Sequence, residues 1–452
     1  MTTVEEFDRD AVELGRAARK MVSRSGLGEW GAGPGREDPV TILERQGESR
    51  VAELLPIRYA RMAISQFTFL RGAPAIMAAD LASGPDTGLT VQLCGDAHLS
   101  NFGLYASPER NLVFDVNDFD ETLPGPFEWD VKRLAASVAV AARDNECPDH
   151  QAGRAAEAAA RGYREAIAAM AELDSLSIWY ERVDADEVTA TIPKEKRRKI
   201  AEKTIKSART RTSLDALEKL TEPDSDGRPR IKNQPPLLVP IETLTEKDVK
   251  EVLNDYRRSL PDERRILLDR HTVVDMAMKV VGVGSVGTRC FIVLFMDKES
   301  GAPLFLQVKQ AEKSVLAAHT KPSKYQHQGH RVVVGQRLMQ AASDIFLGWA
   351  TGPAGNYFYW RQLKDMKGSV DIGALTHHEL AGYAALCGGV LARAHARSGD
   401  PLAINAYLGD SDKFDKAMSE FALAYADQTA ADRDSLLAAI DSGRVPAAAD
   451  PY

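Results

Sequence analysis

The chain has 452 residues, of which 44% are hydrophobic, and a formal net charge of −8 at pH 7. This length is enough for two or three domains with a large core, and the negative charge argues against nucleic acid as the main partner. The sequence has no apolar run of about 18 residues, no signal-peptide pattern and no paired cysteine spacing. We therefore expect a soluble, cytoplasmic protein with reduced thiols and with neither nucleic acid nor a membrane as a partner.

Residues 1–49 are expected to form a helix, Val4 to Ser23, followed by a glycine-rich loop. From Arg50 to Ala82 the periodicity predicts helices that carry several arginines shortly before an acidic stretch. These charges have two interpretations. They can cover solvated or ion-paired helix faces, or Arg71, which follows aromatic residues, can recognise a phosphate or a carboxylate group.

Between residues 94 and 121, acidic side chains alternate with apolar ones. Val91–Cys94 and Leu112–Phe114 read as short buried strands, and the turn between the two halves predicts a β-hairpin from Phe102 to Asp118. Carboxylates that converge in this way repel one another unless a cation, a proton or a basic side chain offsets them. A hard divalent cation such as Mg²⁺, held by oxygen ligands and shared with substrate phosphates, suits this stretch.

The spacing of Asp96 and Asn101 resembles the catalytic loop of protein kinases, where the Asp positions a hydroxyl nucleophile and the Asn holds a metal. The form Gly-Asp-x-His-x-x-Asn, which includes His98, is similar to the aminoglycoside phosphotransferase and choline kinase branch. Two aspartates compete for the remaining metal position of that pattern. The spacing slightly favours Asp115, whereas Asp118 heads an Asp-Phe-Asp triplet, and we retain both.

After the hairpin, Gly125 to Val131 resembles a further motif of the same branch, in which Asp130 would brace the catalytic loop. The Ala-rich stretch from Val131 to Leu173 predicts two helices that separate near Pro148. Lys194 to Arg211 is expected to be a basic, solvated helix. The proline-rich segment from Pro223 to Pro240 is the best candidate for a linker.

A glycine-rich loop then leads into two predicted strands, Phe291–Phe295 and Leu304–Lys309. In a dinucleotide-binding fold, Gly-x-Gly-x-x-Gly lies between a strand and a helix, but here a β-run follows it. A glycine loop between strands, followed by a strand that ends in an apolar-flanked lysine, is instead the kinase arrangement. The alternative is that Lys309 is a strand residue that reaches solvent. The candidate nucleotide-binding residues are Gly282, Gly284, Ser285, Gly287 and Lys309.

Downstream, the sequence predicts a helix at 328–342, a strand at 356–363 in the place of a kinase hinge, and helices at 377–397 and 412–426. These elements suggest four parts. They are an N-terminal extension (1–49), a helix-rich lobe with the catalytic loop and metal hairpin (50–270), a small β-rich nucleotide-binding lobe (271–365) and C-terminal helices that pack on the large lobe (366–452).

The order of the motifs differs from that of an ordinary kinase, in which the glycine loop and the lysine precede the catalytic loop. Either one match is accidental or the chain is circularly permuted, which a fold accepts when the new ends lie in surface loops. A second pair with the same spacing, Asp400 and Asn405, stands in the conventional place. We reject this pair because neither a hairpin nor a strand-borne Asp follows it.

The chain resembles an uncharacterised bacterial family called domain of unknown function 2252 (DUF2252), from about Arg50 to Asp432. The motifs that carry the resemblance are Gly95–Gly103, Asn117–Glu121, Gly335–Arg337 and His395–Asp400. That family is similar to the protein-kinase-like superfamily. The resemblance therefore implies an α+β, kinase-like two-lobe fold, circularly permuted, with a helix-rich large lobe and a small antiparallel β lobe. It implies no substrate.

One departure from the kinase pattern concerns the partner of Lys309. No acidic residue lies between Lys313 and Ser343, where the helix that pairs with this lysine would be. Either Glu312 or the neutral Gln336 would have to serve instead.

The main functional hypothesis is phosphoryl transfer from ATP, with Mg²⁺, to an unknown small-molecule or protein hydroxyl. Asp96 would accept the proton of the nucleophile, and Asn101 with Asp115 or Asp118 would hold the metal. His98 would fix the loop more readily than act as a base, and Asp120 and Glu121 would be outer acids. The alternatives are a nucleotide-binding pseudokinase or interaction module without turnover and, with less support, a metal-dependent hydrolase.

Overall fold

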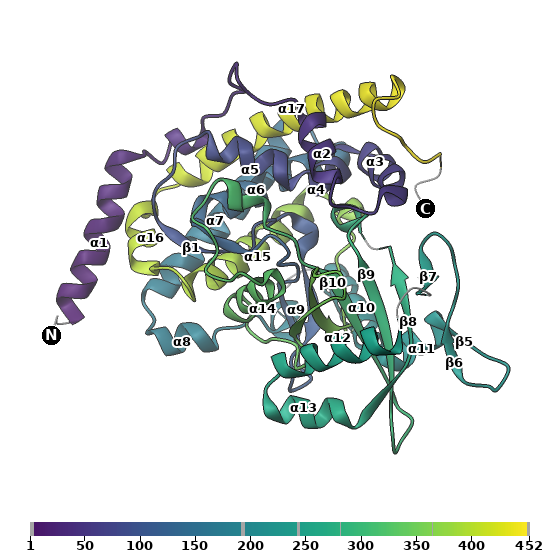
Figure 1. Cartoon of the computed structure of the whole chain (residues 1–452). Helices are drawn as coiled ribbons and strands as arrows, with labels where there is room; N and C mark the ends of the chain where they lie inside the picture. The colour runs from purple at the N-terminus through teal and green to yellow at the C-terminus, as the bar shows by residue number, and fades with distance from the viewer. Residues whose placement is uncertain (1–3, 191–194, 242–244, 281, 364, 450–452) are drawn as a thin grey trace.

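A computed structural model describes residues 4–190, 195–241, 245–280, 282–363 and 365–449 of the chain. It is a mixed α and β structure in which helices fill one side of the molecule and an antiparallel sheet the other (Figure 1). The helical side combines segments from both ends of the chain: α17 (Lys413–Asp441) lies against the N-terminal helices at the top of the view.

The helical side is built around α6 (Phe127–Asp144), which is buried continuously from Phe127 to Ala142. A helix whose side chains are buried on all sides belongs at the centre of a core, and α7, α15 and α17 surround it. The predicted division of this stretch near Pro148 is confirmed, since α7 begins at Asp149. The other helices on this side are α1 (Val4–Met21), α2 (Pro39–Gly47), α3 (Leu55–Ala63), α4 (Gln66–Gly72), α5 (Pro74–Ala82), α7 (Asp149–Ala171), α8 (Ser175–Tyr180), α9 (Ala185–Ala190), α10 (Glu195–Arg209), α15 (His377–Ala396), α16 (Pro401–Leu408) and α17 (Lys413–Asp441).

Two small antiparallel pairs of strands connect this core to the cavity described below. The predicted hairpin is confirmed as β2 (Phe102–Ala106) and β3 (Leu112–Val116), with Gly103 opposite Asp115. The strand before the loop, β1 (Thr90–Leu93), pairs with β4 (Leu123–Pro126). The acidic segment of the sequence therefore runs from one pair of strands to the other across the face of α6.

The large sheet has six antiparallel strands in the order β11-β12-β10-β9-β8-β7. Side chains of successive strand residues alternate between its faces, so that Val293 and Phe295 pack towards α12, and Ile292 and Leu294 towards α11. Its strands are β7 (Leu238–Pro240), β8 (His271–Lys279), β9 (Cys290–Asp297), β10 (Pro303–Gln310), β11 (Gly348–Thr351) and β12 (Tyr357–Gln362), and the helices next to it are α11 (Ser213–Leu220), α12 (Glu246–Ser259), α13 (Asp262–Asp269) and α14 (Gln328–Met339).

The proline-rich segment from 223 to 240 is not a free linker. It contains part of a two-stranded hairpin, β5 (Thr221–Pro223) and β6 (Pro229–Ile231), and strand β7 at the edge of the large sheet. Proline has no N–H to donate, and it is tolerated at strand ends and sheet edges. The helices α11, α12 and α13, which come before residue 270 in the chain, also pack on this sheet.

Several predicted helices correspond to observed ones. The basic helix is α10, whose first described residue is Glu195, since Lys194 lies outside the described residues. The rejected pair at 400–405 has a structural role, because the Asp400 carboxylate accepts a hydrogen bond from Ala403 N at 3.0 Å and caps α16. The last helix, α17, continues to Asp441, well beyond the predicted end.

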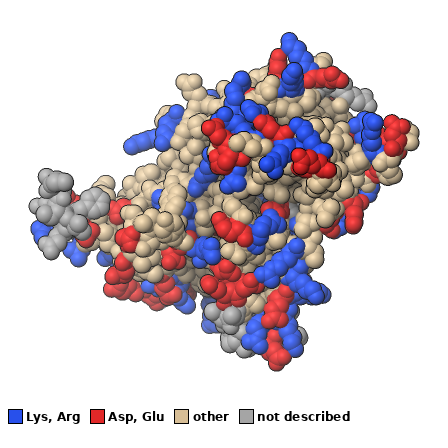
Figure 2. Space-filling model, turned by 90° about the horizontal axis from the view of Figure 1, so that it is seen from below, with Lys and Arg blue, Asp and Glu red and all other residues tan. Residues whose placement is uncertain are grey.

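Within the described ranges, no helix combines the length and the apolar character needed to cross a membrane. The face seen in Figure 2 carries Lys and Arg interspersed with Asp and Glu, without one continuous basic surface.

Candidate active site

The loop between β1 and β2 is closed by hydrogen bonds within itself. Gly95 has φ +84°, and a Cβ atom there would lie 2.3 Å from the carbonyl oxygen of Glu121, so only glycine fits. The carbonyl oxygen of Asp96 accepts from His98 N at 2.8 Å and from Nδ2 of Asn101 at 2.6 Å. The spacing of Asp96 and Asn101 thus allows the Asn101 side chain to close the turn onto the backbone of Asp96.

The loop rests on Asp130 at the start of α6. One carboxylate oxygen of Asp130 accepts from Cys94 N at 2.8 Å and the other from Gly95 N at 3.1 Å. His395 Nε2 lies 3.2 Å from this carboxylate, and its Nδ1 is 2.9 Å from the hydroxyl of Tyr163. The prediction that Asp130 braces the loop is confirmed. Its further supports, His395 and Tyr163, lie far away in the sequence.

Asp96 faces the cavity with one side of its carboxylate and a buried arginine with the other. Two guanidinium nitrogens of Arg133 lie 2.7 and 2.8 Å from Oδ1 of Asp96, and Arg133 also donates to the carbonyl oxygen of Leu70 at 2.7 Å. The Asp96 side chain is 17% exposed, whereas that of Arg133 is 4% exposed. Burial raises the pKa of Asp96 above its ordinary value, and the charge of Arg133 opposes this shift.

His98 lies next to Asp96 and lines the same cavity. Its Nε2 is 3.7 Å from Oδ2 of Asp96, which is too far for a hydrogen bond. Its Nδ1 is buried and has no hydrogen-bond partner among the described residues. Burial, together with the positive charges of Arg71 and Arg133, holds the pKa of His98 well below its ordinary value. The surroundings of His98 therefore disfavour its charged form, and its Nδ1 stays without a protein partner among the described residues.

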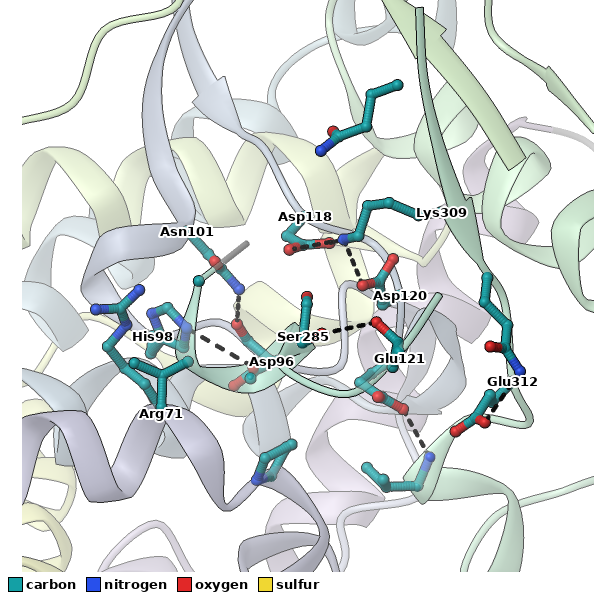
Figure 3. Close-up of a pocket in the computed structure, with 18 of the residues that line it drawn as sticks. Arg71, Asp96, His98, Asn101, Asp118, Asp120, Glu121, Ser285, Lys309 and Glu312 are labelled. Atoms are coloured by element: carbon teal, nitrogen blue, oxygen red, sulfur yellow. Dashed lines mark hydrogen bonds and ion pairs between the residues drawn. The ribbon is translucent and has the colours of Figure 1, made fainter. Parts of the chain in front are cut away.

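Across the cavity, Lys309 projects from β10 towards two aspartates of the loop after β3 (Figure 3). Its Nζ lies 2.5 Å from Oδ2 of Asp120 and 3.3 and 3.4 Å from the two carboxylate oxygens of Asp118. The hydroxyl of Tyr359 donates to the other oxygen of Asp120 at 2.6 Å. Lys309 is only 2% exposed, so it does not reach solvent. Its acidic partners are Asp118 and Asp120 rather than either expected residue.

The charges in this group stabilise one another. Burial alone would lower the pKa of Lys309, but Asp118 and Asp120 raise it well above its ordinary value. Burial alone would raise the pKa of Asp118, but nearby cations, of which Lys309 is the strongest, outweigh burial and lower it. Glu312 and Gln336 interact elsewhere, with Gln310 and Gln340 respectively.

Asp115 lies outside this cavity. Its carboxylate oxygens are 2.7 and 2.8 Å from one nitrogen of Arg393, and one of them also accepts from Ala341 N at 2.8 Å. Asp115 is 1% exposed and Arg393 is 4% exposed. The geometry therefore favours Asp118 over Asp115 as the carboxylate that can meet a ligand.

The pair of Asp115 and Arg393 should contribute strongly to stability. We expect Arg393→Met to lower the free energy of unfolding by about 3–5 kcal/mol, because it leaves a buried carboxylate without its cation. Urea unfolding followed by circular dichroism measures this loss. The control is Arg45→Met, which removes an exposed pair with Glu37 and should cost less than about 1 kcal/mol. Equal losses in the two variants would contradict this account.

The glycine loop joins β8 to β9 and contains the 3₁₀ turn Val283–Ser285. Gly287 has φ +90°, which favours glycine, and its carbonyl oxygen accepts from Val51 N at 2.8 Å. Arg50 donates to the carbonyl oxygen of Gly284 at 3.0 Å. The loop is thus fastened to the N-terminal segment, and in Figure 3 it passes in front of Asp96 with Ser285 over the cavity.

These elements enclose a cavity of about 360 Å³. It brings together most of the residues predicted from the sequence, and only Asp115 and Gly287 are absent from its wall. The predicted residues that line it are Asp96, His98, Asn101, Asp118, Gly282, Gly284, Ser285 and Lys309.

One end of the cavity carries polar residues that the sequence analysis did not identify. Arg361 on β12 donates to Oε1 of Gln307 at 3.0 Å and to the carbonyl oxygen of Asn117 at 2.9 Å. Arg133 was also missed. Its only local sequence signal is its position one helical turn after Asp130, while Arg361 lies in an aromatic strand without any motif.

The oxygen atoms at the cavity suit a metal that is shared with a ligand. Among the described residues, no three His, Cys, Asp or Glu side chains lie close enough together to hold a metal alone. Mg²⁺ bound with phosphates needs only one or two protein oxygens. Asp118 supplies a carboxylate. Because Asn101 donates through Nδ2, its side-chain oxygen stays available. Asn101 and Asp118 are therefore the residues that would hold such a metal.

Comparison with known proteins identifies a family but no reaction. A family model described as "Uncharacterized protein conserved in bacteria (DUF2252)" matches residues 50–439. No curated protein matches the chain, and no solved structure does. The matched range includes the loop that carries Asp96 and Asn101, the glycine loop and Lys309.

Proposed function

The chain belongs to the DUF2252 family of uncharacterised bacterial proteins, and we propose that it is an ATP- and Mg²⁺-dependent phosphotransferase. One observation carries the proposal. A single cavity is lined by Asp96, Asn101 and Asp118 from the helical side, and by Lys309 and the glycine loop from the sheet. These are the side-chain types, on the kinds of element, that phosphoryl transfer in kinases requires.

The topology supports a kinase-like, circularly permuted architecture. The glycine loop joins two antiparallel strands, β8 and β9, and the next strand, β10, bears Lys309. A helix, α14, and two further strands follow, and then α15 returns to the helical side. The catalytic-loop segment, which follows such a helix in a kinase, lies here on α6 but comes from the first third of the chain.

Each residue has a role that follows from its position. Asp96 accepts a hydrogen bond from the acceptor hydroxyl, orients it and takes its proton as transfer proceeds. Asn101 and Asp118 would hold Mg²⁺, which when bound neutralises charge on the phosphates. Lys309 donates to the same phosphates, and Asp120 with Tyr359 keeps its ammonium group in place. Reaction in such a site depends on positioning and charge.

A nucleotide-binding protein without turnover is the second candidate, and one contact favours it. Lys309 lies against Asp118, the carboxylate that would have to hold the metal. If a bound nucleotide does not separate this pair, the cavity can hold phosphates without transferring them. For a two-metal hydrolase, which needs several His and Asp ligands in one cluster, the described residues offer no favourable observation.

The first test is a calorimetric titration of the full chain with ATP in the presence of Mg²⁺. We expect saturable binding at micromolar to millimolar ATP, and weaker binding when EDTA replaces Mg²⁺. A lack of binding at millimolar ATP would contradict the proposal. Formation of ADP over time, measured with the same preparation, separates an enzyme from a binding protein.

A further inference from the structure

The wall of the cavity that comes from the N-terminal segment carries arginines without acidic partners. Arg50, Arg58 and Arg71 come from residues 50–71, and none of them makes an ion pair within 4.0 Å with a described residue. Arg50 and Arg71 line the cavity, and Arg58 lies fully buried behind them. The other buried arginines among the described residues are compensated: Arg133 and Arg393 pair with Asp96 and Asp115, and Arg331 donates to three backbone carbonyl groups.

Arg71 is the most accessible of the three. It lies in the last turn of α4, and its guanidinium group extends along His98 at the edge of the cavity (Figure 3). Its Nε is buried and has no hydrogen-bond partner among the described residues. A Cβ atom on Gly282 would lie 3.7 Å from one of its terminal nitrogens, so Arg71 also reaches the glycine loop.

The other two arginines add uncompensated charge. Arg50 uses one nitrogen for carbonyl groups of the glycine loop, while its Nε is buried without a partner. Arg58 donates to Gln46 and to the carbonyl oxygen of Gly72, but its Nε and one terminal nitrogen have no such partner. Burial lowers the pKa of all three arginines, which means that their charged forms are poorly solvated.

No acid pairs with these cations within 4.0 Å among the described residues, although Glu312 acts on Arg50 from farther away. Two of the acids around the cavity contact other groups. The Asp96 carboxylate is held by Arg133. The Glu121 carboxylate accepts from Val315 N at 2.7 Å. Leaving guanidinium groups buried without a counter-charge is costly. An anion that enters the cavity would remove this cost, and the planar guanidinium group suits phosphate.

We propose that Arg71, backed by Arg50 and Arg58, binds a phosphate group on the acceptor, so that the acceptor is an already phosphorylated small molecule. This inference rests on the proposed function. In Figure 3, Arg71 and His98 lie on one side of Asp96, and Lys309 with Asp118 lies on the other. Nucleotide phosphates occupy the side of Lys309, and the acceptor hydroxyl must meet Asp96 from the remaining side. Three cations suit a phosphate dianion better than a carboxylate.

The test uses inorganic phosphate as the probe and calorimetry on the full chain. The first titration uses the nucleotide-free protein, and the second uses protein saturated with Mg²⁺ and β,γ-imido-ATP. We expect phosphate to bind in both titrations. Arg71→Met should weaken it about ten- to a hundred-fold, the usual value of charge-assisted hydrogen bonds. Arg71→Lys should recover only part of the affinity for phosphate, since lysine keeps the positive charge but lacks the paired N–H donors of the planar guanidinium group. Arg45→Met, the matched loss of one exposed positive charge, should bind like the wild type.

Three results would overturn the inference. The wild type could fail to bind phosphate, Arg71→Met could bind it as well as the wild type does, or β,γ-imido-ATP could displace it. The last result would assign the subsite to the nucleotide instead of the acceptor. Failure of the proposed function is recognised separately, because it appears as absent nucleotide binding and leaves the titration of nucleotide-free protein unchanged. Arg71 has no ion pair to lose, so its variants should remain folded, which thermal unfolding verifies.

Discussion

Asp118→Asn should reduce phosphoryl transfer on the order of a thousand-fold and weaken the binding of ATP in the presence of Mg²⁺. The substitution removes the charged oxygen that faces the phosphate side of the cavity, and charge stabilisation by a metal is worth several kcal/mol, with about 1.4 kcal/mol for each factor of ten. Asp120 and Tyr359 still hold Lys309 in the variant, so the loss reports on the metal position. Calorimetry with and without Mg²⁺, together with ADP formation, measures both effects.

The matched control is the same substitution three residues earlier. Asp115→Asn should lower the free energy of unfolding, because Asp115 holds the buried Arg393, but it should leave the effect of Mg²⁺ on ATP binding unchanged. This pair of variants decides between the two aspartates that the sequence leaves open. If Asp115→Asn, and not Asp118→Asn, abolished the Mg²⁺ effect, the assignment from the geometry would be wrong.

Local sequence patterns were sufficient wherever an element and its role depend on neighbouring residues. The hairpin from Phe102, the division at Pro148 and the brace at Asp130 all follow from short motifs, and the structure contains each of them. A glycine with φ +84° and an Asn that closes a turn onto Asp96 are likewise local requirements.

The contacts that local patterns did not predict join residues far apart in the chain. The preference for Asp115 relied on spacing along the hairpin, but on this strand its side chain points into the core, where Arg393 from α15 meets it. Similarly, the two expected partners of Lys309, Glu312 and Gln336, follow it closely in the chain, whereas the observed partners precede it, Asp120 by 189 residues. No local periodicity encodes such pairs.

The same reason explains the proline-rich segment. Its composition is that of a linker, but β7 adds to the edge of the large sheet, where β8 offers unpaired backbone groups. Composition predicts the conformation of an isolated segment. In the folded protein, pairing with the free edge of β8 makes part of this segment a strand. The polar end of the cavity, built by Arg361 and Gln307 from two different strands, was missed for the same reason.

Asp96→Asn should lower the rate of ADP formation by about 10²–10⁴-fold while the affinity for ATP and Mg²⁺ changes little. This is the usual contribution of a positioned general base. Among the described residues, the Asp96 carboxylate has its hydrogen bonds and ion pair with Arg133 and not with Lys309 or the glycine loop. The asparagine side chain keeps an oxygen for Arg133, so the loop should remain folded, which thermal unfolding verifies. A variant with the wild-type rate would exclude Asp96 as the base, and an equal loss of affinity would give it a binding role.

The pH dependence of the wild-type rate tests the same residue without a substitution. A base acts only when it is deprotonated, so the rate should rise with pH through the pKa of Asp96. Because burial raises that pKa, the midpoint should lie above about 3.9, the value of an ordinary aspartate. Arg133→Met removes the positive charge that opposes this shift, so it should move the midpoint to still higher pH. If the rate of Arg133→Met fell at low pH with the same midpoint as the wild type, another group would be titrating. Arg133 lies within 3 Å of Asp96 and of no other carboxylate among the described residues.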